Sequence, residues 1–259
     1  VNKFVNKDVL YMSATPIPRT LHLSLSGIQS ISSLSTPPVS RKPISTVVSY
    51  FSEDLIKQAI YFEISRGGQV FYLHNRISSI LSIKAFLLRL CPAVKIAVVH
   101  SRLGTKKIKD LISSFVNKKY NLLLCSSVIG AGVDIPNANT ILIDNAHLFG
   151  LSQLHQIRGR VGRGTLQGFA YLFVPKEGRL TSGGKKRLQT IEQNSMLGSG
   201  YNLSRADLEF RGGGAVFGYK QSGSAYDVGY EYYSKVVSRC FEKQSKKNFL
   251  SLVDAFNYK

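Results

Sequence analysis

Short apolar runs alternate with amphipathic stretches through the middle of the chain. Six runs rich in β-branched and other apolar residues predict strands, at 44–50, 69–74, 94–99, 121–125, 140–143 and 168–174. Residues 53–66 carry Ile56, Ile60 and Ile64 at four-residue steps, a helical stripe that ends at two glycines. Further helices are predicted at 77–90, 106–116 and 151–163.

Strands that are apolar almost throughout and that alternate with helices predict an α/β fold, with a parallel sheet covered on both faces. In such sheets the carboxyl ends of the strands meet at one edge, and ligands bind there. Candidate functional residues are therefore expected just after the strands.

The two ends of the chain differ from this middle part. Residues 9–16 predict a short strand closed by a proline, and the serine-rich stretch 24–40 predicts a linker. After Pro175 we expect a basic helix at 180–196, a short helix at 204–210 and a final helix from about 227 to 242. The predicted division is 1–40, 41–176 and 177–259.

Composition adds an expectation about partners. The 259 residues carry a net charge of +19, which indicates a polyanionic partner, although a biased genome composition is an alternative explanation. The three cysteines and five histidines have no metal-ligand spacing, so no metal site is predicted. No run has membrane-spanning length and the N-terminus has no signal-peptide pattern, so we expect a bacterial-type cytoplasmic protein, with a plastid as the alternative.

Residues with candidate catalytic or binding side chains are most concentrated at 156–163, QIRGRVGR. On the predicted helix, Gln156, Arg160 and Arg163 share one face. Gly159 and Gly162 would leave room for a backbone or a phosphate chain to approach closely. Guanidinium groups match phosphate oxygens, so this segment is a candidate for contacting the γ-phosphate of a nucleotide. The alternative is a basic helix end that only touches nucleic acid.

This segment resembles motif VI of superfamily 2 helicases, and residues 125–136, CSSVIGAGVDIP, resemble motif V of the same superfamily. The resemblance implies that Arg160 and Arg163 act as arginine fingers on ATP and that Gln156 orients them. It also implies that Gly132 and Asp134 lie at the nucleotide cleft. A plain turn before Ile135 remains the alternative role for Asp134.

Three further passages narrow the resemblance. Residues 13–21, SATPIPRTL, resemble motif III of RecG-like and transcription-repair-coupling translocases. Residues 198–201, GSGY, with DLEFRGGG at 207–214 and QSG at 221–223, resemble the translocation motif that follows the second lobe in both groups. The stretch 24–38 is more similar to the coupling factors. The resemblance implies a RecA-like second helicase lobe with a helical hairpin and loop appended.

The same resemblance suggests roles for residues outside motifs V and VI. Ser13 and Thr15 would link two motor lobes, or else form a strand end and a helix cap. Arg211 and Gln221 would couple lobe motion to movement along DNA. Three residues that follow strands would contact DNA phosphates, or else belong to solvated loops: Asn75, Arg76 and Arg102.

The function that the resemblance implies is the second motor lobe of an ATP-dependent double-stranded DNA translocase in transcription-coupled repair. The 259 residues contain no phosphate loop, so Mg²⁺-ATP would be held by a first lobe, in the same protein or in another chain. RNA polymerase would be contacted only through modules outside this sequence. Gly130 and Ser101 depart from the family pattern, which keeps open a catalytically dead nucleic-acid-binding remnant. A RecG-like fork-remodelling helicase is the other alternative.

Overall fold

The computed structural model describes residues 41–126, 135–176 and 180–211, with Leu10, Met12, Ser32, Leu34 and Arg239. Two compact units are present. One spans Ser35–Ser199 and contains the whole sheet, and helix α7 (Gly200–Arg211) belongs to the other. The predicted strand at 9–16, the linker at 24–40 and the helix at 227–242 lie almost wholly outside the described residues.

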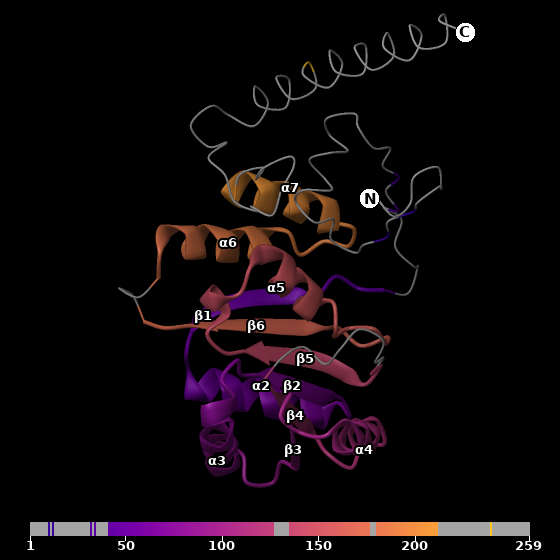
Figure 1. The fold of residues 1–259 in the computed structure, drawn as a ribbon. Coiled ribbons are helices and arrows are strands. Elements are labelled where there is room, and N and C mark those ends of the chain that lie inside the picture. Colours follow the sequence, from indigo (N-terminus) through magenta and orange to yellow (C-terminus); the bar gives the residue numbers. More distant parts are fainter. Residues whose placement is uncertain are drawn as a thin grey trace, which may run out of the picture. The chain divides into compact units, whose positions relative to one another are not determined.

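A six-stranded parallel sheet forms the centre of the first unit, in the order β1-β6-β5-β2-β4-β3 (Figure 1). The predicted parallel α/β fold is therefore confirmed. The strands are β1 Ser45–Tyr50, β2 Gln69–Leu73, β3 Ile96–Val99, β4 Leu122–Cys125, β5 Ala138–Ile143 and β6 Phe169–Val174.

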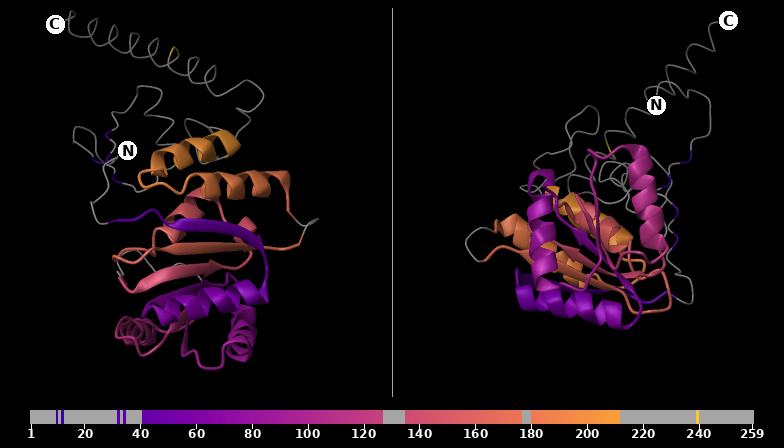
Figure 2. Two further views of the ribbon diagram at one scale, coloured as in Figure 1. Left: turned by 180° about the vertical axis from the view of Figure 1, so that it is seen from behind. Right: turned by 90° about the horizontal axis from the view of Figure 1, so that it is seen from below.

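Helices cover both faces of the sheet because successive strand residues point to opposite sides. Tyr72 of β2 packs in the main hydrophobic cluster with α2 (Glu53–Ser65) and α3 (Ile80–Leu90). Its neighbour Phe71 points the other way and contacts Phe115 of α4 (Thr105–Val116), with ring centroids 5.6 Å apart. Helix α5 (Leu151–Arg158) lies in front of the sheet in Figure 1, and α2 is seen in the view from behind in Figure 2.

The sequence sets the ends of α2 in a direct way. Ser52 is its N-cap, and its hydroxyl accepts from Leu55 N–H at 3.3 Å. Two acidic residues in the first turn favour the positive end of the helix dipole. Gly67 ends the helix at φ +79°, a conformation that glycine adopts without strain. Short 3₁₀ turns precede α3 and α5, η1 (Ile77–Ser79) and η2 (Ala146–Leu148).

The predicted helix at 151–163 is too long. Helix α5 ends at Arg158, and Gly159 is its C-cap. Gly162 then has φ +66°, and a Cβ on it would lie 3.2 Å from Gly168 Cα. Gly162 thus lets the chain turn and pass close to the start of β6, so the expected close backbone approach is present at this glycine. The expectation that Gln156, Arg160 and Arg163 share one helical face is wrong.

Beyond β6 the boundary differs from the predicted division at 176. Helix α6 (Ser182–Gln193) belongs to the same compact unit as the sheet, and that unit runs to Ser199. Leu188 and Ile191 of α6 are buried. Glu192 of α6 accepts the Val48 N–H of the edge strand β1 at 3.1 Å, so the helix covers part of an open sheet edge.

Candidate functional site

The segment after α5 presents two arginines on a turn instead of on a helix. Arg160 is half-buried and Arg163 is exposed. Arg163 Nε donates to Gly159 O at 3.4 Å, which holds this side chain against the end of the helix. Gln156 is exposed on α5. The turn thus separates the two guanidinium groups from the helical row of Gln156, and both remain accessible to an anion.

Arg158, between the candidate fingers and Gln156, has a different environment that the sequence analysis missed. Its side chain is 4% exposed. Its guanidinium donates to Ile191 O and Asn194 O, both at 2.8 Å. A longer contact of 3.4 Å reaches Thr46 Oγ1. Burial lowers the Arg158 pKa to about 10. Arg158 therefore joins α5 to α6 and to the segment after α6.

His155 completes this cluster as a neutral acceptor. Arg158 Nη2 lies 3.2 Å from His155 Nδ1, and a guanidinium can only donate. Burial, with the nearby charges of Arg158 and Arg41, lowers the His155 pKa to about 4. The imidazole is thus uncharged near neutral pH, which is the form that accepts from Arg158.

Three candidate DNA-contacting residues follow strands at one edge of the sheet. Asn75 and Arg76 come just after β2, and Arg102 comes after β3, and all three are exposed. Strand β4 lies between β2 and β3. Neighbouring strands are about 4.8 Å apart, so the two loops start roughly 10 Å apart. The two loops that carry these candidates therefore begin at the same edge of the sheet.

A chain of hydrogen bonds joins four side chains next to the Asn75–Arg76 loop: Ser79, His74, Asp144 and Asn145. His74 Nδ1 lies 2.7 Å from Asp144 Oδ2, and His74 Nε2 lies 2.7 Å from Ser79 Oγ. Asn145 Nδ2 donates to the other Asp144 oxygen at 2.9 Å. His74 and Asp144 are 6% and 8% exposed. The chain joins the ends of β2 and β5 to the start of α3.

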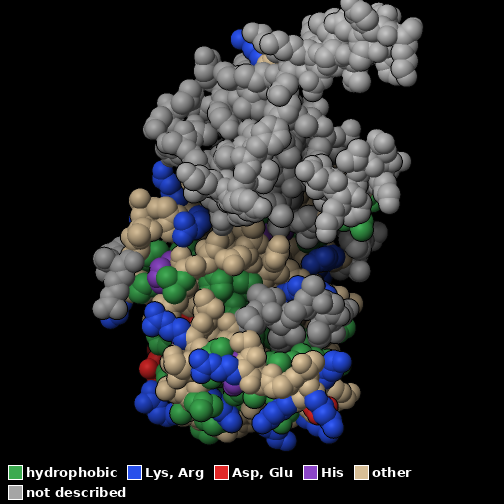
Figure 3. All heavy atoms as spheres, viewed as in Figure 1, with side chains coloured by type: hydrophobic (Ala, Val, Ile, Leu, Met, Phe, Trp, Pro, Cys, Tyr) green, Lys and Arg blue, Asp and Glu red, His purple; other side chains and the backbone are tan. Residues whose placement is uncertain are grey.

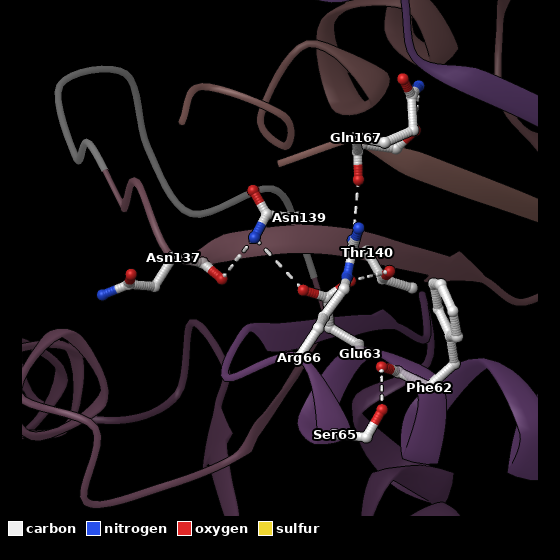
Figure 4. Close-up of polar contacts among 9 residues, drawn as sticks. Phe62, Glu63, Ser65, Arg66, Asn137, Asn139, Thr140 and Gln167 are labelled. Atoms are coloured by element: carbon white, nitrogen blue, oxygen red, sulfur yellow. Dashed lines mark hydrogen bonds and ion pairs between the residues drawn. The ribbon is translucent and has the colours of Figure 1, made fainter. Parts of the chain in front are cut away.

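A buried carboxylate organises the opposite edge of the sheet (Figure 4). Glu63 of α2 is 0% exposed and pairs with Arg66. Thr140 Oγ1 donates to Glu63 at 2.5 Å, and Asn139 Nδ2 donates to it at 3.2 Å. Arg66 also donates to Gln167 O at 2.7 Å. The network thus fixes α2 to the first residues of β5 and to the segment that enters β6.

The described surface is basic, in agreement with the composition. Lys and Arg side chains are spread over the face seen in Figure 3, where few acidic side chains are visible. Lys106, Lys107 and Lys109 of α4 are exposed, as are Lys185 and Lys186 of α6. Arg187 instead donates to His147 O at 3.1 Å. These clusters are solvated faces that add to a positive potential.

Several predicted site residues lie outside the described residues: Ser13, Thr15, Gly132, Asp134 and Gln221. Arg211 ends α7, and its backbone is helical. Within the described ranges, no helix has the length and apolar character to cross a bilayer. The same ranges contain no group of three or more His, Cys, Asp or Glu side chains suited to a metal ion.

Comparison with known proteins identifies the lobe. Residues 52–165 match the helicase conserved C-terminal domain. Over 237 residues, 91% of this chain, the sequence is 47% identical to the transcription-repair-coupling factor of Helicobacter pylori. It is 43% identical over 230 residues, 89% of the chain, to that of Myxococcus xanthus. The chain belongs to the transcription-repair-coupling factor family.

The chain covers only part of these relatives, 24% of the Helicobacter protein and 19% of the Myxococcus protein. A solved structure of RecG bound to a three-way DNA junction is also similar, with a TM-score of 0.65 and 31% identity. That match covers 84% of this chain and 30% of RecG. The RecA-like helicase fold of the second lobe is thus shown, and the predicted family is confirmed.

Proposed function

We propose that this chain is the second motor lobe of an ATP-dependent double-stranded DNA translocase that acts in transcription-coupled repair. The observation that carries the proposal is the identity of 47% to a transcription-repair-coupling factor over 91% of the chain. The lower identity of 31% to RecG favours this function over a fork-remodelling helicase. RNA polymerase and the repair partners would be engaged by other parts of such a protein.

Arg160 and Arg163 would act on ATP held by a first lobe. They fit a triphosphate because both carry a permanent positive charge on a turn that leaves them accessible. Gln156 would contact them or the nucleotide, and Gly132 and Asp134 would line the same cleft. ATP supplies the free energy of phosphoryl transfer, and Mg²⁺ would be held mainly by the first lobe. The role of this lobe is to stabilise charge that develops on the phosphoryl oxygens.

DNA would lie along the carboxyl edge of the sheet, where Asn75, Arg76 and Arg102 are exposed. Contacts from these residues to phosphates position the duplex without reading its sequence. Ser13 and Thr15 would link the two lobes. Arg211 and Gln221 would convert closure of the cleft into a step along DNA.

The experiment adds a separately produced first lobe to this chain and measures ATP turnover with and without duplex DNA. DNA-stimulated turnover is expected only for the pair, because the 259 residues contain no phosphate loop. Arg160→Ala and Arg163→Ala should each lower kcat by roughly 10³-fold or more, with nucleotide binding largely retained. Lys109→Ala is a matched basic control on an exposed face. Normal turnover in both arginine variants would refute the finger assignment.

A further inference from the structure

The strongest unassigned feature is the chain of side chains Ser79, His74, Asp144 and Asn145. Its two central distances are both 2.7 Å, and its central members are nearly buried. A carboxylate only accepts, so His74 Nδ1 carries a proton and donates to Asp144. The other ring nitrogen, Nε2, bonds to the Ser79 hydroxyl. The four residues therefore form one continuous hydrogen-bond chain.

The arrangement has the order of a hydrolytic triad, but its surroundings do not support that chemistry. An oxyanion needs free N–H donors beside the serine. Ser79 N–H already donates to Arg76 O at 3.3 Å, and Ile80 N–H donates to Ile77 O. Neither backbone group next to the hydroxyl is available for a substrate. The hydrogen-bond chain is therefore structural and does not form a hydrolytic site.

The bond between the His74 and Ser79 side chains closes a short loop. Residues 75–78 run between these two side chains and contain Asn75 and Arg76, both exposed. Ser79 Oγ also lies 3.5 Å from Arg76 O. Ser79 occupies the N-cap position of α3, yet its side chain makes no capping bond. A serine side chain at this position normally stabilises the start of a helix, and here its hydroxyl binds His74 instead.

The other end of the chain is anchored on rigid structure. His74 N–H donates to Cys125 O and Asp144 N–H donates to Leu73 O, both at 2.9 Å, so both residues continue the sheet ladder. Asn145 has φ 51° and holds the second carboxylate oxygen. The loop is thus tied through His74 to the carboxyl ends of β2 and β5.

We propose that Ser79 and His74 are positioning residues that hold the Asn75–Arg76 loop in the conformation that contacts DNA phosphates. This inference rests on the proposed DNA contact of Arg76 and adds the residues that make the contact possible. A preformed loop pays less ordering entropy when it binds, so the brace raises duplex affinity through Arg76. Loss of the brace should have the same effect as loss of the arginine.

The test measures duplex DNA binding by the full 259-residue chain at several salt concentrations. Arg76→Ala should reduce the slope of log K against log salt by about one unit, the loss of one phosphate contact. Ser79→Ala should reduce affinity and slope in the same way. The double variant R76A/S79A should lose less affinity than the sum of the two single losses, since both changes act on the Arg76 contact.

Two variants provide matched controls. Ser78→Ala removes an exposed hydroxyl one residue away and should leave binding unchanged. Ser79→Thr retains the hydroxyl and should restore the slope. Thermal melting of S79A should stay close to that of the parent, because His74 Nε2 can bond to water at the partly exposed position of Ser79.

The outcomes distinguish failure of the proposed DNA contact from failure of the positioning role of Ser79. If the parent chain binds DNA with no salt dependence, the proposed function fails and this inference fails with it. If R76A weakens binding but S79A binds like the parent, the brace is refuted while the DNA contact stands. If the losses caused by R76A and S79A add in full in the double variant, Ser79 does not act through Arg76 and the positioning role is refuted.

Discussion

Replacing Arg158 by Met is the perturbation with the clearest expected effect on the lobe. The change retains much of the apolar volume and removes five donors from a site that is 4% exposed. The two short bonds go to Ile191 O and Asn194 O at 2.8 Å, and each charge-assisted bond is worth about 1.5–3 kcal/mol. The gross loss is therefore roughly 3–6 kcal/mol.

The net loss is smaller because a buried guanidinium also carries a desolvation cost. Burial lowers the Arg158 pKa to about 10, which is the sign of that cost. Its two short bonds go to neutral backbone carbonyls, so removal of the charge leaves no buried carboxylate behind. We expect Arg158→Met to lower the free energy of unfolding by about 2–4 kcal/mol.

Urea denaturation followed by circular dichroism measures this change through the midpoint and the m-value. Arg158→Lys should fall between the parent and the Met variant, since one ammonium cannot reach acceptors on both sides. Arg89→Met is the matched control, because Arg89 has a long, exposed ion pair of 3.8 Å with Glu53. An R158M midpoint equal to that of R89M would refute the assignment of Arg158 as the joint between α5 and α6.

Three further predictions concern the core and its titration. Tyr72→Phe should leave stability unchanged or raise it by up to about 1 kcal/mol in urea denaturation, because the buried Tyr72 hydroxyl has no partner among the described residues. The His155 imidazole has a pKa of about 4 in the fold, whereas in the unfolded chain it takes up a proton below about pH 6.5. The free energy of unfolding should therefore fall as the pH drops from 6.5 to 4. His155→Gln should reduce that fall by about 1–2 kcal/mol after allowance for partial exposure, and an unchanged pH profile would contradict it. Gly68→Ala should destabilise the fold more than Gly67→Ala, because a Cβ at position 68 would lie 1.6 Å from Glu63 Oε1. A Cβ at position 67 meets no atom within 4 Å, so only the strain of φ +79° acts there. Equal melting temperatures of the two variants would contradict this prediction.

The regular part of the fold could be predicted from the sequence because its signals are local. Ile56 and Ile60 repeat at helical spacing and are both buried, and the strand predicted at 69–74 is observed at Gln69–Leu73. The end of α5 was missed since three arginines and a continuing polar pattern mimic a helix. Only the positive φ of Gly162 and its approach to Gly168 show where the chain turns.

The roles of individual arginines were harder to predict, because one residue type serves opposite purposes within a short segment. Arg158 and Arg160 are two positions apart and have the same chemistry. Burial separates them, and burial depends on α6, which is more than 20 residues further along the chain. The partner of Glu63 at Thr140 is 77 residues away and equally invisible to periodicity. The sequence therefore identified the basic segment, and only tertiary contacts distinguished the buried Arg158 from the more exposed Arg160 and Arg163.

These contacts suggest why the turn after α5 can present two arginines, Arg160 and Arg163, in a fixed position. On the helical side, Arg158 fastens the end of α5 to Ile191 O and Asn194 O. On the strand side, Arg66 bonds to Gln167 O, just before β6 begins, and is itself held by the buried Glu63. The segment that carries Arg160 and Arg163 is thus fixed at both ends by an arginine bonded to backbone carbonyls. Under the proposed function, a guanidinium that reaches a phosphate held by the first lobe would gain from such fixed ends, because little further ordering would be needed when the cleft closes.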